Sequence, residues 1–347
     1  MTFRTSRREW LIGSAAALGG VGLSLGSTRG ATQEAQWNES ARRGLDWLAS
    51  HQSRLGHWTA TNNTYPAAMT ALAGMAMICS GSTTIQGPYA ANVRRATDYL
   101  LNKVTANGLI GDASDNHYTY GHGFSMLFLS QVLGEEEDED RREQLVEVLV
   151  KAVEFSINAQ TASGGWGYVS AKDGSDFDEG STTITQVQGL RGCRNAGIAV
   201  DRDAIERAKK YIYDCKNQDG GISYSSRNRG GSRPAITAAA LAALYNAGDY
   251  ESEHVPEMLA YSKRELHSLN NSGFGHWHYT YLYYSQVMYR QTEEDWHGFR
   301  DRLYARIVSE QQADGSWSEG AYGAVYGTST MLIMLQLDRG LLPIYQR

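Results

Sequence analysis

Three acidic side chains stand together at Asp176-Phe177-Asp178-Glu179, directly ahead of a predicted helix. Clustered carboxyl groups repel one another when charged, so in a poorly solvated site one of them stays protonated near neutral pH. Such an acid can donate its proton to an apolar alkene or epoxide, and aromatic faces can stabilise the resulting carbocation. The alternative is an acidic surface loop over 174–180, whose carboxylates favour the N-terminus of the next helix through its dipole. The residues alone leave both interpretations open.

Tyrosines could supply the aromatic faces, because they concentrate after glycine-rich turns, near the starts of predicted apolar helices. If those helix starts share one mouth, the rings line it and suit either an isoprenoid tail or a sugar chain. His122 lies four residues after Tyr118 on one helix face, as a candidate general acid or base or as a hydrogen-bonded packing residue. The candidate ligand-binding residues are Tyr118, Tyr120, Tyr168, Tyr224, Tyr279, Tyr283, Tyr322 and Tyr326.

Metal ligands are sparse in this sequence. Zinc requires three or four converging nitrogen, sulfur or oxygen ligands, and neither Asp214-Cys215 nor His276-x-His278 has further candidates beside it. With Cys79 and Cys193, Cys215 makes an odd, scattered set without C-x-x-C spacing or a disulfide framework. We therefore expect buried, inert thiols, no metal and no cofactor.

A short element recurs roughly every 55 residues, with a shorter last interval. It begins with Gln or Asn and ends in a glycine followed by Trp or Ile. An amphipathic segment precedes each copy, as in 201–215, and a segment that is apolar on all sides follows, as in 67–79. The six copies are Gln52–Trp58, Asn102–Ile110, Gln160–Trp166, Gln218–Ile222, Asn271–Trp277 and Gln312–Trp317.

Six amphipathic helices that alternate with six apolar ones give twelve helices, which account for the chain from residue 32 to residue 347. A helix that is apolar all round must be covered on every side. An open solenoid would need polar end repeats, and none is evident. The sequence therefore predicts an all-α fold, an (α/α)6 toroid in one domain, with the apolar helices inside and the amphipathic helices outside.

The Gly-x-Trp element resembles the QW motif of triterpene cyclases, in which Gln and Trp tie neighbouring outer helices together. Trp58, Trp166, Trp277 and Trp317 are therefore expected to be packing residues rather than ligand contacts. Together with Tyr120–Phe124 and the ending Tyr326–Arg347, the repeats are similar to bacterial prenyltransferase and squalene-oxidase repeat proteins. This resemblance to the terpenoid-cyclase and protein-prenyltransferase superfamily covers the chain beyond its N-terminal segment and implies the toroid.

The same resemblance implies roles for the acidic cluster. In squalene-hopene-type cyclases, a D-x-D-D motif at the start of an inner helix supplies the initiating proton. Asp178 matches the acid, with Asp176 and Glu179 as supporting carboxylates. The sequence departs from the motif because Glu179 replaces its fourth Asp and Gly180-Ser181 replaces the usual Thr. Those cyclases also use two toroids, whereas one is predicted here.

The N-terminus has the features of an export signal. Ser6–Leu11 contains two adjacent arginines, and a Gly- and Ala-rich apolar stretch follows to about Leu25. We expect a twin-arginine signal over residues 1–31, cleaved near Ala31, and a periplasmic or other extracytoplasmic location. With 38 acidic and 32 basic residues, the chain lacks the basic excess that nucleic acid requires. An apolar small molecule or lipid is the expected partner, with peripheral membrane contact and oligomeric state left open.

Three functions fit these features. The first is a terpenoid-cyclase- or prenyltransferase-like protein that binds or acts on an isoprenoid inside the ring by carboxylic-acid protonation. It predicts an inward-facing, desolvated Asp178 above a deep apolar cavity. The second is a non-catalytic toroid that binds a lipid, peptide or protein at its aromatic mouth. The third is a polysaccharide-active toroid, which needs a second carboxylate across the mouth. Fold alone does not choose among them.

Overall fold

The fold is all-α in the computed structural model, which describes residues 27–174, 176–269, 276–342 and 344. The described residues form twelve α-helices, two short 3-10 helices and only isolated β-bridges. The inner helices are α3 (Pro66–Cys79), α5 (Tyr118–Glu135), α7 (Gly180–Asn195), α9 (Pro234–Asn246), α11 (Trp277–Tyr289) and α13 (Ala324–Leu335). The outer helices are α2 (Ser27–Ser50), α4 (Ala90–Leu101), α6 (Glu139–Ala159), α8 (Arg202–Asp214), α10 (His254–Leu266) and α12 (Glu293–Ser309).

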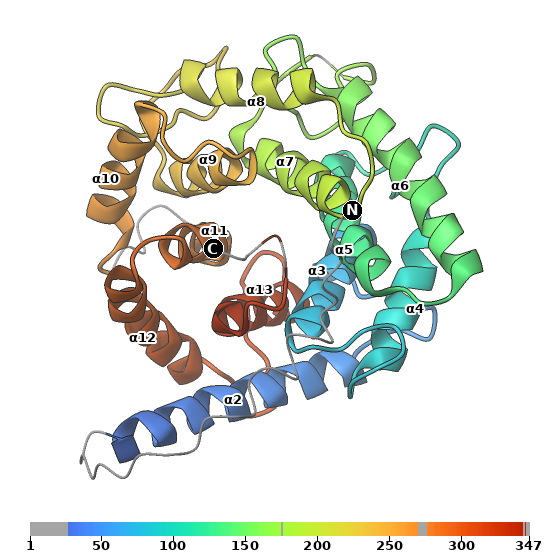
Figure 1. Cartoon of the computed structure of the whole chain (residues 1–347), viewed down its shortest axis with the longest axis vertical. Helices are drawn as coiled ribbons and strands as arrows, with labels where there is room; N and C mark the ends of the chain where they lie inside the picture. Colours follow the sequence, from blue (N-terminus) through green and yellow to red (C-terminus); the bar gives the residue numbers. More distant parts are fainter. Residues whose placement is uncertain (1–26, 175, 270–275, 343, 345–347) are drawn as a thin grey trace, which may run out of the picture.

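The helices close into a double ring, as the repeat predicts. Each inner helix packs on the next, and α13 packs on α3 to complete the inner ring. Each outer helix from α4 to α12 packs against the inner helix that precedes it in the chain (Figure 1). Helix α2 also packs against α12 and α13, so the first and last repeats meet. The predicted (α/α)6 toroid is confirmed.

Burial explains why the two kinds of helix take these places. Every residue from Ala67 to Cys79 in α3 is buried, because the ring neighbours and the outer helices cover it on all sides. In α8, only Ala204, Ala208, Tyr211 and Ile212 are buried, and the charged positions between them face solvent. An apolar stripe covers one inner helix, whereas an all-apolar helix requires the interior.

The glutamine of the recurring element joins its own turn to the next outer helix. Gln52 Nε2 donates to the carbonyl of Gly56 at 2.8 Å and to that of Asn92 in α4 at 3.0 Å. Gln160 makes the same pair of bonds, to Gly164 and to Ala204 in α8. Gly56 has φ +92° and lies against α4 so closely that an added Cβ would meet a backbone oxygen at 2.3 Å. Only glycine fits such a turn without strain.

The last copy of the element closes the ring with a different glutamine from the one predicted. Gln311, not Gln312, donates to Gly315 within the turn and to the Ser40 carbonyl of α2, both at 2.9 Å. The side chain of Gln312 instead accepts from Ser316. The helix phase at the end of α12 decides which of two adjacent glutamines faces α2, and residue type alone does not reveal that phase.

Three of the four expected packing tryptophans are buried beneath these turns. Trp58, Trp166 and Trp317 are at most 1% exposed. Each indole N–H donates to a carbonyl near the end of the preceding outer helix, at 2.6–2.9 Å. Trp277 differs, because it opens α11, is only partly buried and stacks under the Arg306 guanidinium. Residues 271–275 of its element lie outside the described residues.

The expected export signal also lies largely outside the described residues, which begin at Ser27. Helix α2 starts there, so the predicted cleavage point near Ala31 falls within it. No helix in the described chain is long and apolar enough to cross a membrane. The cysteines Cys79, Cys193 and Cys215 are buried as expected, and none is in a disulfide.

Candidate functional site

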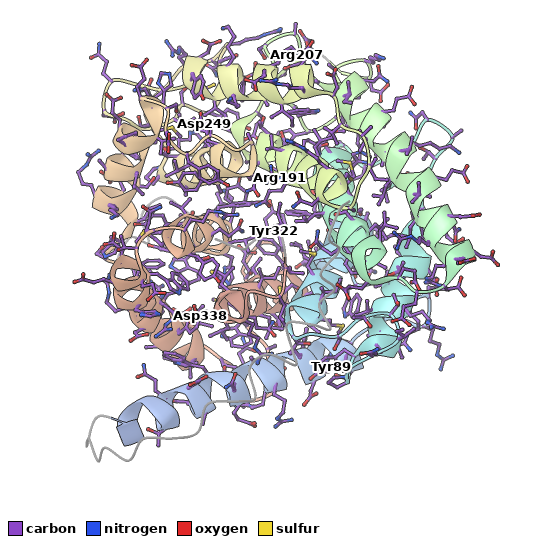
Figure 2. The ribbon with its side chains drawn as sticks, in the orientation of Figure 1. Tyr89, Arg191, Arg207, Asp249, Tyr322 and Asp338 are labelled. Carbon is purple, nitrogen blue, oxygen red and sulfur yellow. The ribbon has the colours of Figure 1, made fainter. Side chains whose placement is uncertain are left out.

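A cavity of about 480 Å³ opens at the end of the ring where the inner helices begin. Across the ring, the side chains of Gln188 in α7 and Gln286 in α11 are buried and hydrogen-bonded at 2.7 Å, toward the other end of these helices. Tyr322, ahead of α13, faces the interior, whereas Arg207 on α8 lies at the outer edge (Figure 2). The volume is in the range of pockets that enclose a small organic ligand.

The residue before an inner helix lines this cavity in five of the six repeats. These residues are the N-caps Tyr65, His117, Glu179, Arg233 and His276. In the sixth repeat, Glu319 and Tyr322 approach from the turn before α13. The inner helices therefore present their N-termini to one mouth, as the sequence predicts. Among these side chains, only Glu179 accepts a hydrogen bond from its own helix.

Aromatic rings form a belt around the cavity. Tyr168 lies at its centre, with its hydroxyl 2.5 Å from that of Tyr224 and its ring 4.4 Å from that of His117. The belt continues from His117 to Tyr65 and then to Tyr322, with 6.1 Å between ring centres at each step. These spacings are typical of edge-to-face aromatic pairs. Electron-rich ring faces therefore surround any ligand in the cavity.

Six of the eight tyrosines predicted from the sequence line the cavity, and two do not. The six are Tyr120, Tyr168, Tyr224, Tyr279, Tyr322 and Tyr326. Tyr118 is buried outside it, where its hydroxyl donates to Asp173 and accepts from the amide of Ser170. Tyr283 is fully buried behind Tyr279, with 4.8 Å between the ring centres. Whether the six tyrosines bind a ligand stays a prediction.

Glu179 places a buried carboxyl group on the cavity wall. It is 1% exposed, and its Oε2 accepts from the amide of Thr182 at 3.1 Å and from the Ser181 hydroxyl. Burial raises the pKa of Glu179 to about 7, even though these hydrogen bonds and the positive charge of Arg233 act in the opposite sense. A large fraction of the side chain is therefore neutral at neutral pH and can donate a proton.

Hydroxyl groups from two further inner helices surround Glu179. The Tyr120 hydroxyl of α5 lies within hydrogen-bonding distance of Ser181 Oγ, which itself donates to Glu179. The Tyr279 hydroxyl of α11 donates to the Ser181 carbonyl at 3.1 Å. Ser181 and Thr182 of α7 thus hold one oxygen of the carboxyl group, and the tyrosines of α5 and α11 hold Ser181.

Asp178, the residue expected to be the acid, is buried but does not line the cavity. Its two oxygens accept from Ser163 Oγ, Ser225 Oγ, and the amide and hydroxyl of Ser226, at 2.7–2.9 Å. Burial acts to raise the pKa of Asp178, but these four bonds outweigh it and hold the pKa below its usual value. Its environment therefore stabilises a carboxylate rather than a proton donor.

Asp176 and Asp178 instead join two loops at the edge of the mouth. Asp176 accepts from the amide of Ala162 at 2.9 Å and pairs with Arg227. Asp178 connects the same two loops through its serines. Glu179 has an extended backbone, in which successive side chains point to opposite sides. This alternation sends Asp178 into the loops and Glu179 into the cavity, which residue spacing alone did not reveal.

His122 is buried beside the outer ring rather than in the cavity. Its Nδ1 accepts from the amide of Ile110, and its Nε2 faces the Ala152 carbonyl of α6, each at 3.1 Å. Burial lowers the pKa of His122 to about 4, so the ring is neutral at neutral pH. Both nitrogens are engaged, which fits the packing role and leaves neither free for general acid–base chemistry.

Sequence reasoning missed several residues of the cavity wall, among them Tyr65, His117, Arg233, His276 and Glu319. The signal that could have found four of them is their position immediately before a predicted inner helix. Within the described part of the chain, no group of three or more His, Cys, Asp or Glu side chains could hold a metal ion.

No family model and no curated protein matches this sequence. Solved structures do match its fold. The type II terpene cyclase MstE from Scytonema, as a variant in complex with the product merosterolic acid A, aligns with a TM-score of 0.62 at 13% identity. The alignment covers 88% of this chain and 97% of that one. The unliganded enzyme aligns with a TM-score of 0.61.

A second kind of toroid is equally similar. The GH76A α-1,6-mannanase from Salegentibacter aligns with a TM-score of 0.66 at 11% identity, over 88% of this chain and 99% of that one. An inactive variant of that enzyme holds α-1,6-mannotriose. Identities this low show the α/α toroid alone, so the resemblance to terpene cyclases extends to architecture and leaves the reaction to the chemistry of the site.

Proposed function

We propose that this protein binds an isoprenoid in its tyrosine-lined cavity and that Glu179, in its neutral form, protonates a double bond of that ligand. The observation that carries the proposal is a buried carboxyl group, with a pKa raised to about 7, on the wall of an aromatic cavity. An ordinary exposed glutamate is almost wholly ionised at neutral pH. The role that the resemblance gave to Asp178 passes to its neighbour in this proposal.

The protonation step balances simply. The Glu179 O–H bond breaks, its proton forms a C–H bond with one alkene carbon, and the other alkene carbon becomes a carbocation. A second double bond of the same chain attacks this carbon and closes a ring. A water molecule takes a proton from a carbon next to the final cation, which completes an isomerisation, and solvent returns a proton to Glu179. The rings of Tyr168, Tyr224 and Tyr322 offer their negative faces to the cationic carbons.

Asp178 acts in this proposal as a positioning residue. Its four hydrogen bonds fasten the loops over 160–179 and 216–233 to each other. The carboxyl group of Glu179 follows directly in the chain, so this junction sets where it enters the cavity. Burial without ligand contact is compatible with that role.

The test is product analysis with squalene and with linear prenyl alcohols of several lengths. The purified protein is incubated with each, and extracts are analysed by gas chromatography–mass spectrometry. Glu179→Gln should abolish any cyclic product, because the amide has no acidic proton. Glu319→Gln is the matched control, since its carboxylate lies in the same cavity but accepts from the amides of Ala321 and Tyr322. Cyclic product from Glu179→Gln at the wild-type rate would refute the proposal.

One observation favours a second function, hydrolysis of a glycan. Glu179 and Glu319 both line the cavity, and a glycoside hydrolase uses two carboxyl groups across its substrate. Release of reducing sugar from α-1,6-mannan or other glycans, lost in both Glu→Gln variants, would favour this function. If neither products nor sugars form while a lipid still binds, the non-catalytic toroid is the remaining interpretation.

A further inference from the structure

The cavity wall changes in polarity with depth. The residues at its rim are the N-caps and the turn before α13, which include Glu179, Arg233 and Glu319. The residues deeper in the ring come from the following helical turns. Leu72 lies about 9 Å along α3 from its first residue, at the usual helical rise. The deepest residues are Met69, Leu72 and Phe124, which are apolar. Nearer the rim, Ala68 and Ile236 stand at the third position of their helices, as do Tyr120, Tyr279 and Tyr326.

A ligand that matches this wall has an apolar body and one polar end at the rim. The apolar floor formed by Met69, Leu72 and Phe124 disfavours a chain that is polar throughout, because polar groups against it would lack partners. A wholly apolar hydrocarbon would leave the rim groups without ligand contacts. The change from a polar rim to an apolar floor therefore favours an amphipathic molecule whose apolar tail lies deepest in the cavity.

Arg233 is an exposed positive charge at the rim. Its guanidinium carbon lies 4.6 Å from the centre of the Tyr224 ring, a cation–π distance that orients the side chain over the cavity wall. The hydroxyl of Tyr224 is in turn held by that of Tyr168. Arg227, from the same loop, pairs with Asp176, whereas no carboxylate in the described residues pairs with Arg233. The guanidinium is oriented and is in no ion pair with a described side chain, although its positive charge acts on the Glu179 carboxyl group.

The surrounding helix ends add to this positive field. Apart from α7, which Glu179 caps, none of the six inner helices has an acidic residue at its N-cap or in its first turn. By contrast, Asp138, Asp201 and Thr292 cap the outer helices α6, α8 and α12 with side-chain oxygens. Uncompensated helix N-termini favour negative charge within the first turn. These helix ends and Arg233 therefore both favour a negatively charged group at the rim.

We propose that the isoprenoid bound in the cavity carries an anionic head group, a carboxylate or a phosphate, which Arg233 binds at the rim while the apolar chain lies against the floor. The inference rests on the proposed function, whose substrate class it specifies. Arginine presents a planar fork of donors that matches two oxygens of such a group. The head group also bears on the chemistry, because a negative charge near Glu179 favours the neutral, proton-donating form of that acid.

Calorimetric titration with three ligands of equal chain length tests this proposal. They are geranylgeranoic acid, geranylgeranyl monophosphate and geranylgeraniol, the neutral reference. At pH 8, one anionic ligand at least should bind about tenfold more tightly than the alcohol, as a charge-assisted hydrogen bond implies. Raising the salt concentration should weaken binding of the anionic ligand and leave the affinity for the alcohol unchanged. The acid and phosphate arms distinguish the two head groups.

Arg233→Gln should abolish the preference for the anion and leave binding of the alcohol intact. Arg233→Lys, which keeps the charge but loses the fork, should retain part of it. The matched control is Arg264→Gln, because Arg264 stacks on Tyr261 with 5.0 Å to the ring centre but lies on outer helix α10. This control should keep the full preference.

The outcomes separate the two proposals. If the alcohol binds as tightly as both anions, or if Arg233→Gln keeps the preference, the anionic head group is refuted while isoprenoid binding stands. If none of the three ligands binds to the folded wild-type protein, the proposed function fails and the head-group inference fails with it.

Discussion

Replacing Glu179 with glutamine should make the protein more resistant to unfolding at alkaline pH. The carboxylate form of Glu179 is disfavoured by burial, which raises the pKa of this group from 4.5 to about 7 in the folded state. Between these values the folded state binds more protons than the unfolded state, so stability falls as pH rises. Glutamine has the shape of the neutral acid and does not titrate. The free energy of unfolding of the variant should therefore not fall in this pH range on account of residue 179.

The magnitude follows from the size of the pKa shift. A shift from 4.5 to about 7 corresponds to roughly 3 kcal/mol of unfolding free energy at about 1.4 kcal/mol for each pKa unit. The difference in stability between Glu179→Gln and wild type should be constant below pH 4.5 and grow by that amount toward pH 8. Asp178, whose pKa is lowered, contributes the opposite slope at acid pH in both proteins, so it cancels in the difference.

Urea unfolding at several pH values between 4.5 and 8, followed by circular dichroism at 222 nm, provides the assay. Glu319→Gln serves as the control, because Glu319 is only partly buried at the same mouth. The unfolding free energy of Glu319→Gln should change with pH in the same way as that of wild type. If the curves of Glu179→Gln and wild type are parallel as well, Glu179 titrates normally in the folded protein and the reasoning from burial is refuted.

Three further predictions concern other residues. Asp178→Asn should destabilise the fold by about 2–4 kcal/mol, because an amide cannot accept all four hydrogen bonds, yet any activity should keep its pH dependence; a changed profile would make Asp178 itself the acid. Ser181→Ala should raise the pKa of Glu179 and move the alkaline limb of a pH–rate profile upward by about half to one pH unit, whereas Ser232→Ala, a cavity serine bonded to Asp219, should not. Replacing Arg7 and Arg8 by lysine should hold the protein in the cytoplasm of a host with twin-arginine transport, as cell fractionation would measure; unchanged export would refute the signal.

The architecture could be read from the sequence because it repeats. Gln160, Gly164 and Trp166 each perform a local task, and Gln or Asn, Gly, and Trp or Ile at similar spacing mark the other turns. The alternation of amphipathic and all-apolar helices then leaves a double ring as the economical packing. Local details were less accessible, as Gln311 and Gln312 show, because one step of helix phase separates them.

The site was only partly predictable for a similar reason. Proximity to an inner helix start placed six tyrosines correctly in the cavity wall, but Tyr118 turns toward Asp173 instead. The acidic cluster was found as a cluster, and its two buried members could not be told apart by type. Asp178 and Glu179 differ in direction along an extended segment, which gives one a lowered pKa and the other a raised pKa. The direction in which each of these two side chains points is set by the folded loops, so residue type alone does not predict it.

The most direct test of the acid role is to run the reaction in D2O and measure the mass of the cyclic product. In D2O the carboxyl group of Glu179 exchanges its proton for a deuteron before it meets the ligand. The account predicts a product that carries a deuteron at the carbon protonated first, and no product from Glu179→Gln. A cyclic product without deuterium, or a labelled product from the glutamine variant, would contradict the claim that Glu179 starts the reaction.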